Sequence, residues 1–213
     1  MDWRSQQEDM IRLMKERGAI KSKAIEKAIR EAPRHLFVPK EQEGKAYEDV
    51  PLPIGEGQTI SQPSTVALMT WMLDVREGDK VLEIGSGSGW QAAILSNLGA
   101  KVWTIERIGE LATMAEKNLK KAGIRNVEVI EGDGSLGLKE HAPYDRIIVT
   151  CACPEVPKAL VDQLKTGGKM VIPVGGRDMQ TMLIIRKTAK GIERRDMGNF
   201  IFVPLIGKYG FKR

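Results

Sequence analysis

The chain has few of the residues that build redox or metal sites. Its 213 residues include two cysteines and two histidines, and Cys151 and Cys153 are separated by a single residue. Thiols this close cannot link distant parts of a fold, and a structural zinc site needs a fuller set of Cys and His ligands. The sequence therefore predicts reduced thiols at the end of a buried strand, no metal site and a cytoplasmic location.

Long apolar runs and long basic runs are missing as well. No apolar stretch approaches the ~20 residues of a membrane span, and the opening MDWRSQQEDM lacks the apolar core of a signal peptide. The net charge is +5, but the basic residues alternate with apolar ones at helical spacing. A solvated helix face explains this pattern better than a nucleic-acid-binding patch does. We expect no membrane or nucleic-acid partner, and a monomer.

Before residue 80 the sequence predicts helices on either side of an irregular stretch. Residues 3–17 and 21–31 carry apolar side chains at helical spacing. From His35 to Pro63 prolines and glycines recur, and so long a segment without regular structure is typical of a lid or a binding loop. Ser64 is expected to cap a buried helix over residues 65–73.

From Lys80 onward short apolar strands alternate with helices, the pattern of a mostly parallel sheet covered on both faces. An antiparallel pair of strands closes the chain. The fold class predicted is thus α/β, with a doubly wound, mostly parallel, seven-stranded sheet and additional N-terminal helices. Strands are expected at 81–84, 102–106, 127–130, 146–150, 169–173, 182–186 and 200–205, and helices at 89–98, 109–122 and 156–165.

A glycine-rich turn follows the first of these strands. Gly85, Gly87 and Gly89 alternate with serines, and glycine lets a backbone approach a ligand that a β-carbon would push away. A dinucleotide fingerprint needs glycine where Trp90 stands, so a nicotinamide oxidoreductase is disfavoured. Glu83, two residues before the first glycine, suits a ligand with an ammonium group.

Two further acids stand at the ends of the next strands. Glu106 ends the second strand, where a carboxylate can accept hydrogen bonds from ribose hydroxyls. Asp133 follows the third strand between two glycines, where it could meet a purine ring. With Glu83 these acids would bind an ammonium, a ribose and an adenine amine, which is the outline of S-adenosylmethionine. The set resembles the class I methyltransferase motifs over residues 78–175.

Four motifs narrow this resemblance to one family. They are His35-Leu36-Phe37-Val38-Pro39, Gly57-Gln58-Thr59-Ile60-Ser61-Gln62-Pro63, Val81 to Trp90, and Tyr144 to Ala152. Together they resemble protein-L-isoaspartate O-methyltransferases, from about His35 to Pro204. The resemblance implies methyl transfer from S-adenosylmethionine to the free α-carboxylate of L-isoaspartyl residues in damaged proteins and peptides, which starts repair through a succinimide.

The resemblance also implies roles for individual residues. Ser61 would be the catalytic hydroxyl beside the acceptor carboxylate, and Val203 and Leu205 would meet the substrate with it. The residues expected to bind the cofactor are Gln58, Thr59, Ile60, Glu83, Gly85, Ser86, Gly87, Gly89, Glu106, Arg107, Gly132, Asp133 and Gly134.

One domain, residues 1–213, would carry this activity. Residues 1–75 would supply the N-terminal helices and the lid, residues 76–175 the cofactor-binding core, and residues 176–213 the C-terminal strands. Two alternatives stay open: an RNA or small-molecule methyltransferase on the same fold, and a nucleic-acid-binding domain without catalysis.

Overall fold

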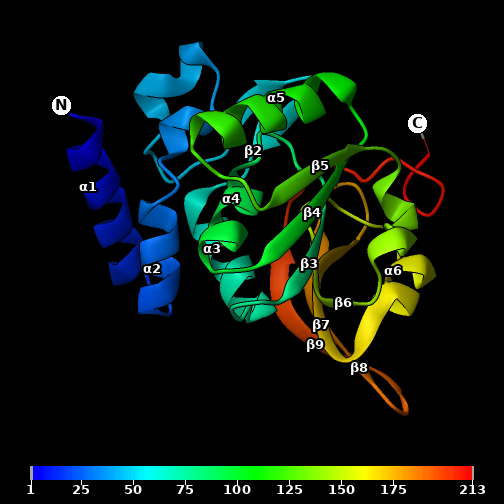
Figure 1. Ribbon diagram of the computed structural model, residues 1–213. Coiled ribbons are helices and arrows are strands. Elements are labelled where there is room, and N and C mark those ends of the chain that lie inside the picture. The colour runs from blue at the N-terminus through cyan, green and yellow to red at the C-terminus, as the bar shows by residue number, and fades with distance from the viewer. Residues whose placement is uncertain (1, 213) are drawn as a thin grey trace.

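A seven-stranded sheet runs through the middle of the computed structural model, which describes residues 2–212 (Figure 1). The strands are β3 (Lys80–Ile84), β4 (Lys101–Glu106), β5 (Val127–Glu131), β6 (Tyr144–Val149), β7 (Leu164–Gly175), β8 (Gln180–Thr188) and β9 (Gly191–Phe200). Their order is β5-β4-β3-β6-β7-β8-β9, parallel from β5 to β7 and antiparallel beyond. The predicted seven-stranded, mostly parallel sheet is confirmed. Met1 and Arg213, the ends of the predicted domain, lie outside the described residues.

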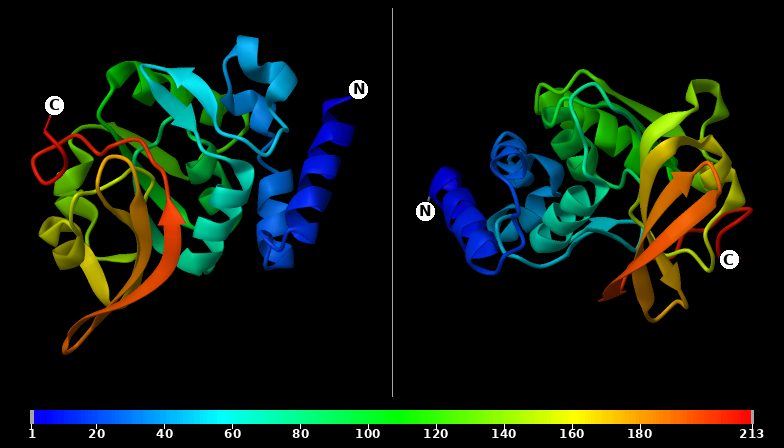
Figure 2. Two further views of the ribbon diagram at one scale, coloured as in Figure 1. Left: turned by 180° about the vertical axis from the view of Figure 1, so that it is seen from behind. Right: turned by 90° about the horizontal axis from the view of Figure 1, so that it is seen from below.

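Helices cover both faces of the sheet, because successive side chains of its central strands are apolar on both sides (Figure 2). Val81 and Ile148 pack with apolar residues of α3 and α4 on one face, whereas Leu82 and Ile147 pack with Leu160 of α6 on the other. The helices are α3 (Pro63–Leu73), α4 (Trp90–Asn97), α5 (Gly109–Lys121) and α6 (Lys158–Gln163). In the part of the chain that is described, no helix is long and apolar enough to cross a membrane.

Two N-terminal helices, α1 (Trp3–Glu16) and α2 (Lys23–Arg30), pack outside α3 and α4, as the apolar spacing predicted (Figure 1). The next segment is more regular than the sequence indicated. It contains the 3-10 helices η1 (Arg34–Phe37) and η2 (Lys40–Lys45) and a hairpin of β1 (Leu52–Gly55) and β2 (Gln58–Ile60). The expectation of an irregular stretch was wrong because strands this short, interrupted by proline and glycine, give no alternating pattern.

The predicted cap of α3 was also wrong. The helix begins at Pro63, so Ser64 lies inside its first turn. A residue distant in sequence binds there instead: the carboxylate of Asp49 accepts hydrogen bonds from the backbone N–H of Ser64 (2.8 Å) and from its hydroxyl (2.6 Å). A carboxylate at this position satisfies a free amide and complements the helix dipole.

The last strand lies earlier than predicted, at Gly191–Phe200 rather than 200–205. As an edge strand β9 exposes charged residues, so its sequence shows no apolar run. The apolar run belongs to the segment after it, which crosses the carboxyl end of the sheet. There Ala152 donates its N–H to the carbonyl of Val203 (2.8 Å), and Leu205 donates to the carbonyl of Ala152 (2.8 Å).

Candidate active site

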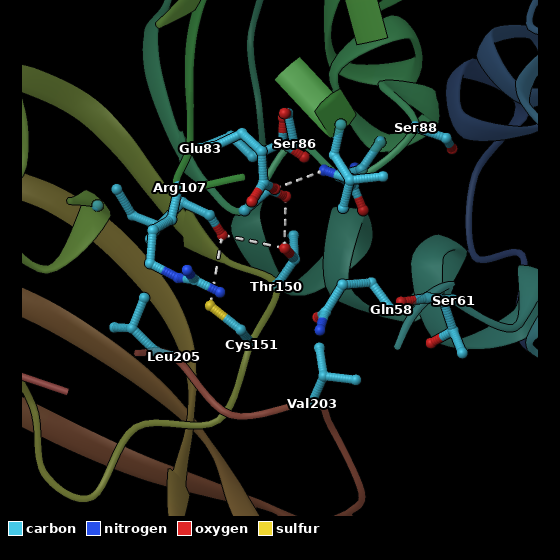
Figure 3. A pocket seen from close by; sticks show the side chains of 18 of the residues that line it. Gln58, Ser61, Glu83, Ser86, Ser88, Arg107, Thr150, Cys151, Val203 and Leu205 are labelled. Carbon is cyan, nitrogen blue, oxygen red and sulfur yellow. Dashed lines mark hydrogen bonds between the residues drawn. The ribbon is translucent and has the colours of Figure 1, made fainter. Parts of the chain in front are cut away.

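A cavity opens at the carboxyl ends of β3, β4 and β6, where parallel sheets bind ligands (Figure 3). The β1–β2 hairpin and the segment after β9 form its other walls. Figure 3 shows Gln58, Ser61 and Val203 on one side and Glu83, Arg107 and Cys151 across from them. The sequence-predicted residues that line the cavity are Gln58, Thr59, Ile60, Ser61, Glu83, Gly85, Ser86, Gly87, Glu106, Arg107, Gly134, Val203 and Leu205.

The glycine turn needs glycine for two different reasons. Gly85 and Gly87 have φ values of +90° and +50°, and both line the cavity. A β-carbon on Gly85 would lie 2.6 Å from the hydroxyl of Thr150, so none fits there. Gly89 lies outside the cavity lining: its β-carbon would meet Leu119 and Ala115 of α5 at 3.2 and 3.3 Å. Gly89 therefore allows α4 and α5 to pack closely, and its contact with the cofactor stays a prediction.

Glu83 is the most unusual group in the site. Its side chain is fully buried, and neither carboxylate oxygen has a hydrogen-bond partner within residues 2–212. Burial raises the pKa of Glu83 to about 8, because a charged carboxylate is poorly solvated there. A carboxylate in such a position is suited to a cationic ligand, whose charge would favour the ionised form.

Glu106 is held in a defined orientation by the backbone. One carboxylate oxygen accepts a hydrogen bond from the N–H of Gly87 (3.0 Å), and the other accepts from the N–H of Ile108 (3.0 Å). The side chain is 8% exposed, so it is nearly buried beside the glycine turn. Its remaining lone pairs can accept hydrogen bonds from a diol.

The third predicted acid lies elsewhere. Neither Gly132 nor Asp133 lines the cavity, whereas Gly134 does. Asp133 accepts hydrogen bonds from the amide (2.9 Å) and hydroxyl (2.7 Å) of Ser135 and from the amide of Lys208 (2.8 Å). It therefore binds the C-terminal segment, and a contact between Asp133 and a purine stays a prediction.

Ser61 follows the hairpin, which lies against the glycine turn. Ile54 of β1 is buried, and its Cδ1 would be 3.3 Å from a β-carbon on Gly87. This contact brings the Gln58–Ser61 run to the wall opposite Glu83 (Figure 3). The structure thus brings together the hydroxyl, the glycine turn and two of the three acids that the sequence singled out.

The sequence interpretation gave no role to three residues at the site. Thr150 and Cys151 line the cavity just after β6, and the hydroxyl of Thr150 lies 2.9 and 2.6 Å from the carbonyls of Ile84 and Gly85. Their position at the carboxyl end of a central strand could have indicated that they line a ligand site. Both cysteines are free. Burial raises the pKa of the Cys151 thiol, and burial raises the pKa of the Cys153 thiol to about 12, as expected of unreactive thiols. Arg34 is fully buried, and the sequence pattern did not indicate a role for it.

Comparison with known proteins gives one family. The family described as Protein-L-isoaspartate(D-aspartate) O-methyltransferase (PCMT) matches residues 5–210. A protein-L-isoaspartate O-methyltransferase of Methanopyrus kandleri is 51% identical, over 99% of this chain and 95% of the relative. Another, of Methanoculleus marisnigri, is 49% identical, over 98% of this chain and 95% of the relative.

Solved structures agree with the sequence matches. A protein-L-isoaspartate O-methyltransferase superposes with a TM-score of 0.88 at 32% identity, covering 96% of this chain and 67% of that one. A Plasmodium falciparum structure described as the same enzyme, in complex with S-adenosyl-L-homocysteine, gives a TM-score of 0.83 at 25% identity, covering 94% and 98% of the two chains. The chain therefore belongs to the protein-L-isoaspartate O-methyltransferase family and uses S-adenosylmethionine.

Proposed function

We propose that the cavity between the glycine turn and Ser61 is where this chain methylates its substrate. As a member of its family, the chain is an S-adenosylmethionine-dependent enzyme that esterifies the free α-carboxylate of L-isoaspartyl residues in damaged proteins and peptides, initiating repair through a succinimide. The observation that carries the assignment to this cavity is that Glu83, Glu106 and Ser61 line one and the same cavity.

The residues present fit the cofactor. Glu83 would bind its ammonium group, since a buried carboxylate without partners in the described chain needs a cation. Glu106 would bind the ribose hydroxyls, because backbone amides already fix its orientation. Gly85, Ser86, Gly87, Arg107 and Gly134 would contact the remainder. When bound, S-adenosylmethionine supplies an electrophilic methyl group on a positively charged sulfur.

Ser61 would orient the acceptor carboxylate by donating a hydrogen bond to it. An α-carboxylate has a pKa of about 3.5, so it is already an anion at neutral pH and needs no general base. Holding it in line for attack can remove several kcal/mol of entropic barrier, on the order of a hundredfold in rate or more. The hairpin, which buries Ile54 against the glycine turn, would exclude water from the reacting groups.

Val203 and Leu205 would meet the peptide substrate. Both line the cavity in the segment that crosses the end of the sheet, and the carbonyl of Val203 is already bonded to Ala152. Pairing through backbone atoms would accept damage sites of many sequences.

We further propose that the chain acts as a monomer in the cytoplasm, without a nucleic-acid or membrane partner. The edge strand β9 supports the monomer, because its exposed residues include Glu193, Arg194, Arg195 and Asp196. Charges on an edge strand oppose pairing with a second sheet. The three segments 1–75, 76–175 and 176–213 would supply the lid, the cofactor-binding core and the substrate-facing strands.

The test compares an isoaspartyl peptide with its aspartyl twin, using labelled S-adenosylmethionine. We expect base-labile label in the isoaspartyl peptide alone. Ser61→Ala should lower kcat by roughly tenfold or more, because the acceptor loses its orienting hydrogen bond, while S-adenosylhomocysteine affinity is unchanged. Label in RNA, or in base-stable products, would contradict the assignment.

A further inference from the structure

Arg34 is a fully buried guanidinium that binds backbone carbonyls of the substrate-side segment. Nη1 donates to the carbonyls of Ala46 (2.8 Å) and Glu48 (3.2 Å), and Nη2 donates to those of Val50 (3.0 Å) and Ser61 (3.1 Å). Within residues 2–212, no carboxylate forms an ion pair with it. One side chain thus organises the segment from Ala46 to Ser61.

The two carbonyls bound by Nη2 lie at the open end of the hairpin. Val50 precedes β1 and Ser61 follows β2, and the pair Leu52 and Ile60 is the outermost in the hairpin register. A single nitrogen therefore joins the two legs just beyond the point where their strand pairing ends. Because the Ser61 carbonyl is fixed, the backbone from which the Ser61 side chain extends is fixed as well.

The same guanidinium also contacts the cofactor side of the site. It lies 5.2 Å from the ring centroid of Trp90, the first residue of α4 after the glycine turn. Trp90 is buried, lines the cavity and donates its indole N–H to the carbonyl of Ala32 (2.9 Å). Arg34 thus bridges the hairpin that carries Ser61 and the helix that follows the glycine turn.

We propose that Arg34 is a positioning residue for methyl transfer, which sets the place of Ser61 relative to the glycine turn. This inference rests on the proposed function of the cavity. Lysine cannot substitute, because one ammonium nitrogen cannot reach all four carbonyls, three of which precede the hairpin and one of which follows it. Its four hydrogen bonds also stabilise the segment, because their loss would leave buried carbonyls without a donor. A positioning role differs from this stabilising one in that it couples Arg34 to Ser61 in kcat.

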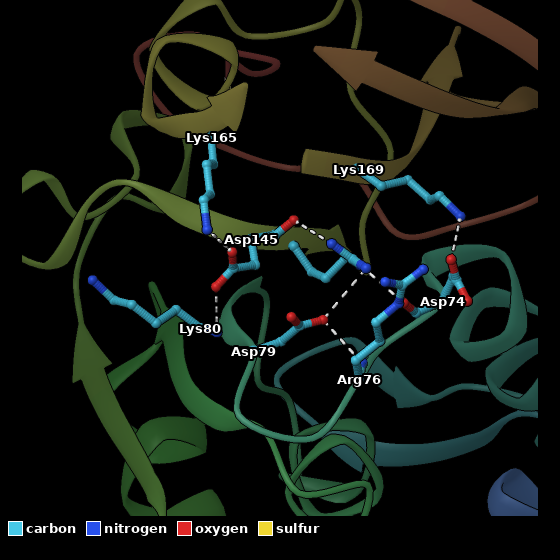
Figure 4. Close-up of polar contacts among 8 residues, drawn as sticks. Asp74, Arg76, Asp79, Lys80, Asp145, Lys165 and Lys169 are labelled. Atoms are coloured by element: carbon cyan, nitrogen blue, oxygen red, sulfur yellow. Dashed lines mark hydrogen bonds and ion pairs between the residues drawn. The ribbon is translucent and has the colours of Figure 1, made fainter. Parts of the chain in front are cut away.

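Arg146 offers a matched control at the other end of the sheet. It is 9% exposed and also binds carbonyls, those of Asp74 (2.9 Å) and Asp145 (2.9 Å), besides an ion pair with Asp79 (3.5 Å). It lies outside the cavity lining. Figure 4 shows these three partners, Asp74, Asp79 and Asp145. Arg34→Lys and Arg146→Lys are therefore the same change at two buried sites, only one of which touches the Ser61 segment.

The experiment is a double-mutant cycle measured with an isoaspartyl peptide at saturating S-adenosylmethionine. We expect Arg34→Lys to lower kcat by about tenfold or more in the wild-type background but by less than about threefold beside Ser61→Ala, because both changes disturb the same group. Arg146→Lys should lower the melting temperature and leave kcat within about twofold in both backgrounds. S-adenosylhomocysteine binding by calorimetry checks that each variant is folded.

Additive losses for Arg34→Lys and Ser61→Ala, or an equal loss of kcat in Arg146→Lys, would overturn the proposal. If the lysine variant does not fold, Arg34→Gln replaces it, since a neutral amide leaves no unpaired charge buried. Failure of both variants to fold would make Arg34 a folding residue and would also overturn the proposal. If the wild-type chain leaves the isoaspartyl peptide unmethylated, the proposed function fails first, which is a different result.

Discussion

The two ends of the central sheet differ in whether their polar side chains have partners within the protein. At the amino ends of the strands the charged side chains bind one another: Asp145 accepts from Lys165 (2.7 Å) and from the amide of Lys80 (3.0 Å), and Arg146 pairs with Asp79 (Figure 4). At the carboxyl ends, both oxygens of Glu83 have no partner in the described chain. The amino ends of the strands thus contribute stability, whereas the carboxyl ends keep an unpaired carboxyl group that can bind a ligand.

The largest effect should come from replacing the ionisable carboxyl group of Glu83 in the ligand-free protein. The folded-state pKa of about 8 is raised above the ordinary 4.5, so the folded state holds a proton that the unfolded state releases. The bound proton therefore contributes to the free energy of unfolding. This contribution is fully present below pH 4.5 and is lost as the pH rises to 8. The free energy of unfolding of Glu83→Gln, relative to that of the wild type, should therefore rise by on the order of 4 kcal/mol between pH 5 and pH 9.

Denaturant unfolding of both proteins at several pH values measures this difference. The difference should shrink when S-adenosylhomocysteine is present, because its ammonium stabilises the ionised carboxylate of the wild type alone. A stability difference that does not change with pH would show that Glu83 is ionised and partnered.

Breaking the amino-end network should destabilise the protein without affecting the site. Arg146→Met removes the ion-pair partner of Asp79 and the side-chain donor to two carbonyls, and removing one partner of a buried pair costs about 3 kcal/mol. Thermal melts should record this loss, and calorimetry should give unchanged S-adenosylhomocysteine affinity. A weaker affinity in this variant would mean that the two ends are coupled.

A smaller effect, on S-adenosylhomocysteine affinity, should distinguish Glu106 from Asp133. Glu106→Ala should weaken S-adenosylhomocysteine binding by about 30-fold, since charged hydrogen bonds contribute roughly 2 kcal/mol. Asp133→Ala, beyond the next strand, should cost less affinity, because Asp133 binds Ser135 and Lys208 outside the cavity. Equal losses, measured by calorimetry, would restore Asp133 as a direct cofactor contact.

The cofactor side was predictable because local sequence determines it. Gly85 and Gly87 mark a turn that needs positive φ, and Glu83 and Glu106 stand at strand ends that a parallel sheet brings together. The substrate side was less predictable. The hairpin is held by Arg34 and the start of α3 by Asp49, and both contacts join residues distant in sequence. Nothing in the local pattern around either residue indicates its partner.

The most direct measurement is a crystal structure with S-adenosylhomocysteine and an isoaspartyl peptide bound. We expect the ligand's ammonium against Glu83, its ribose against Glu106, and the isoaspartyl carboxylate beside the Ser61 hydroxyl, facing the sulfur. A ligand bound outside this cavity, or a carboxylate held away from Ser61, would contradict this expectation.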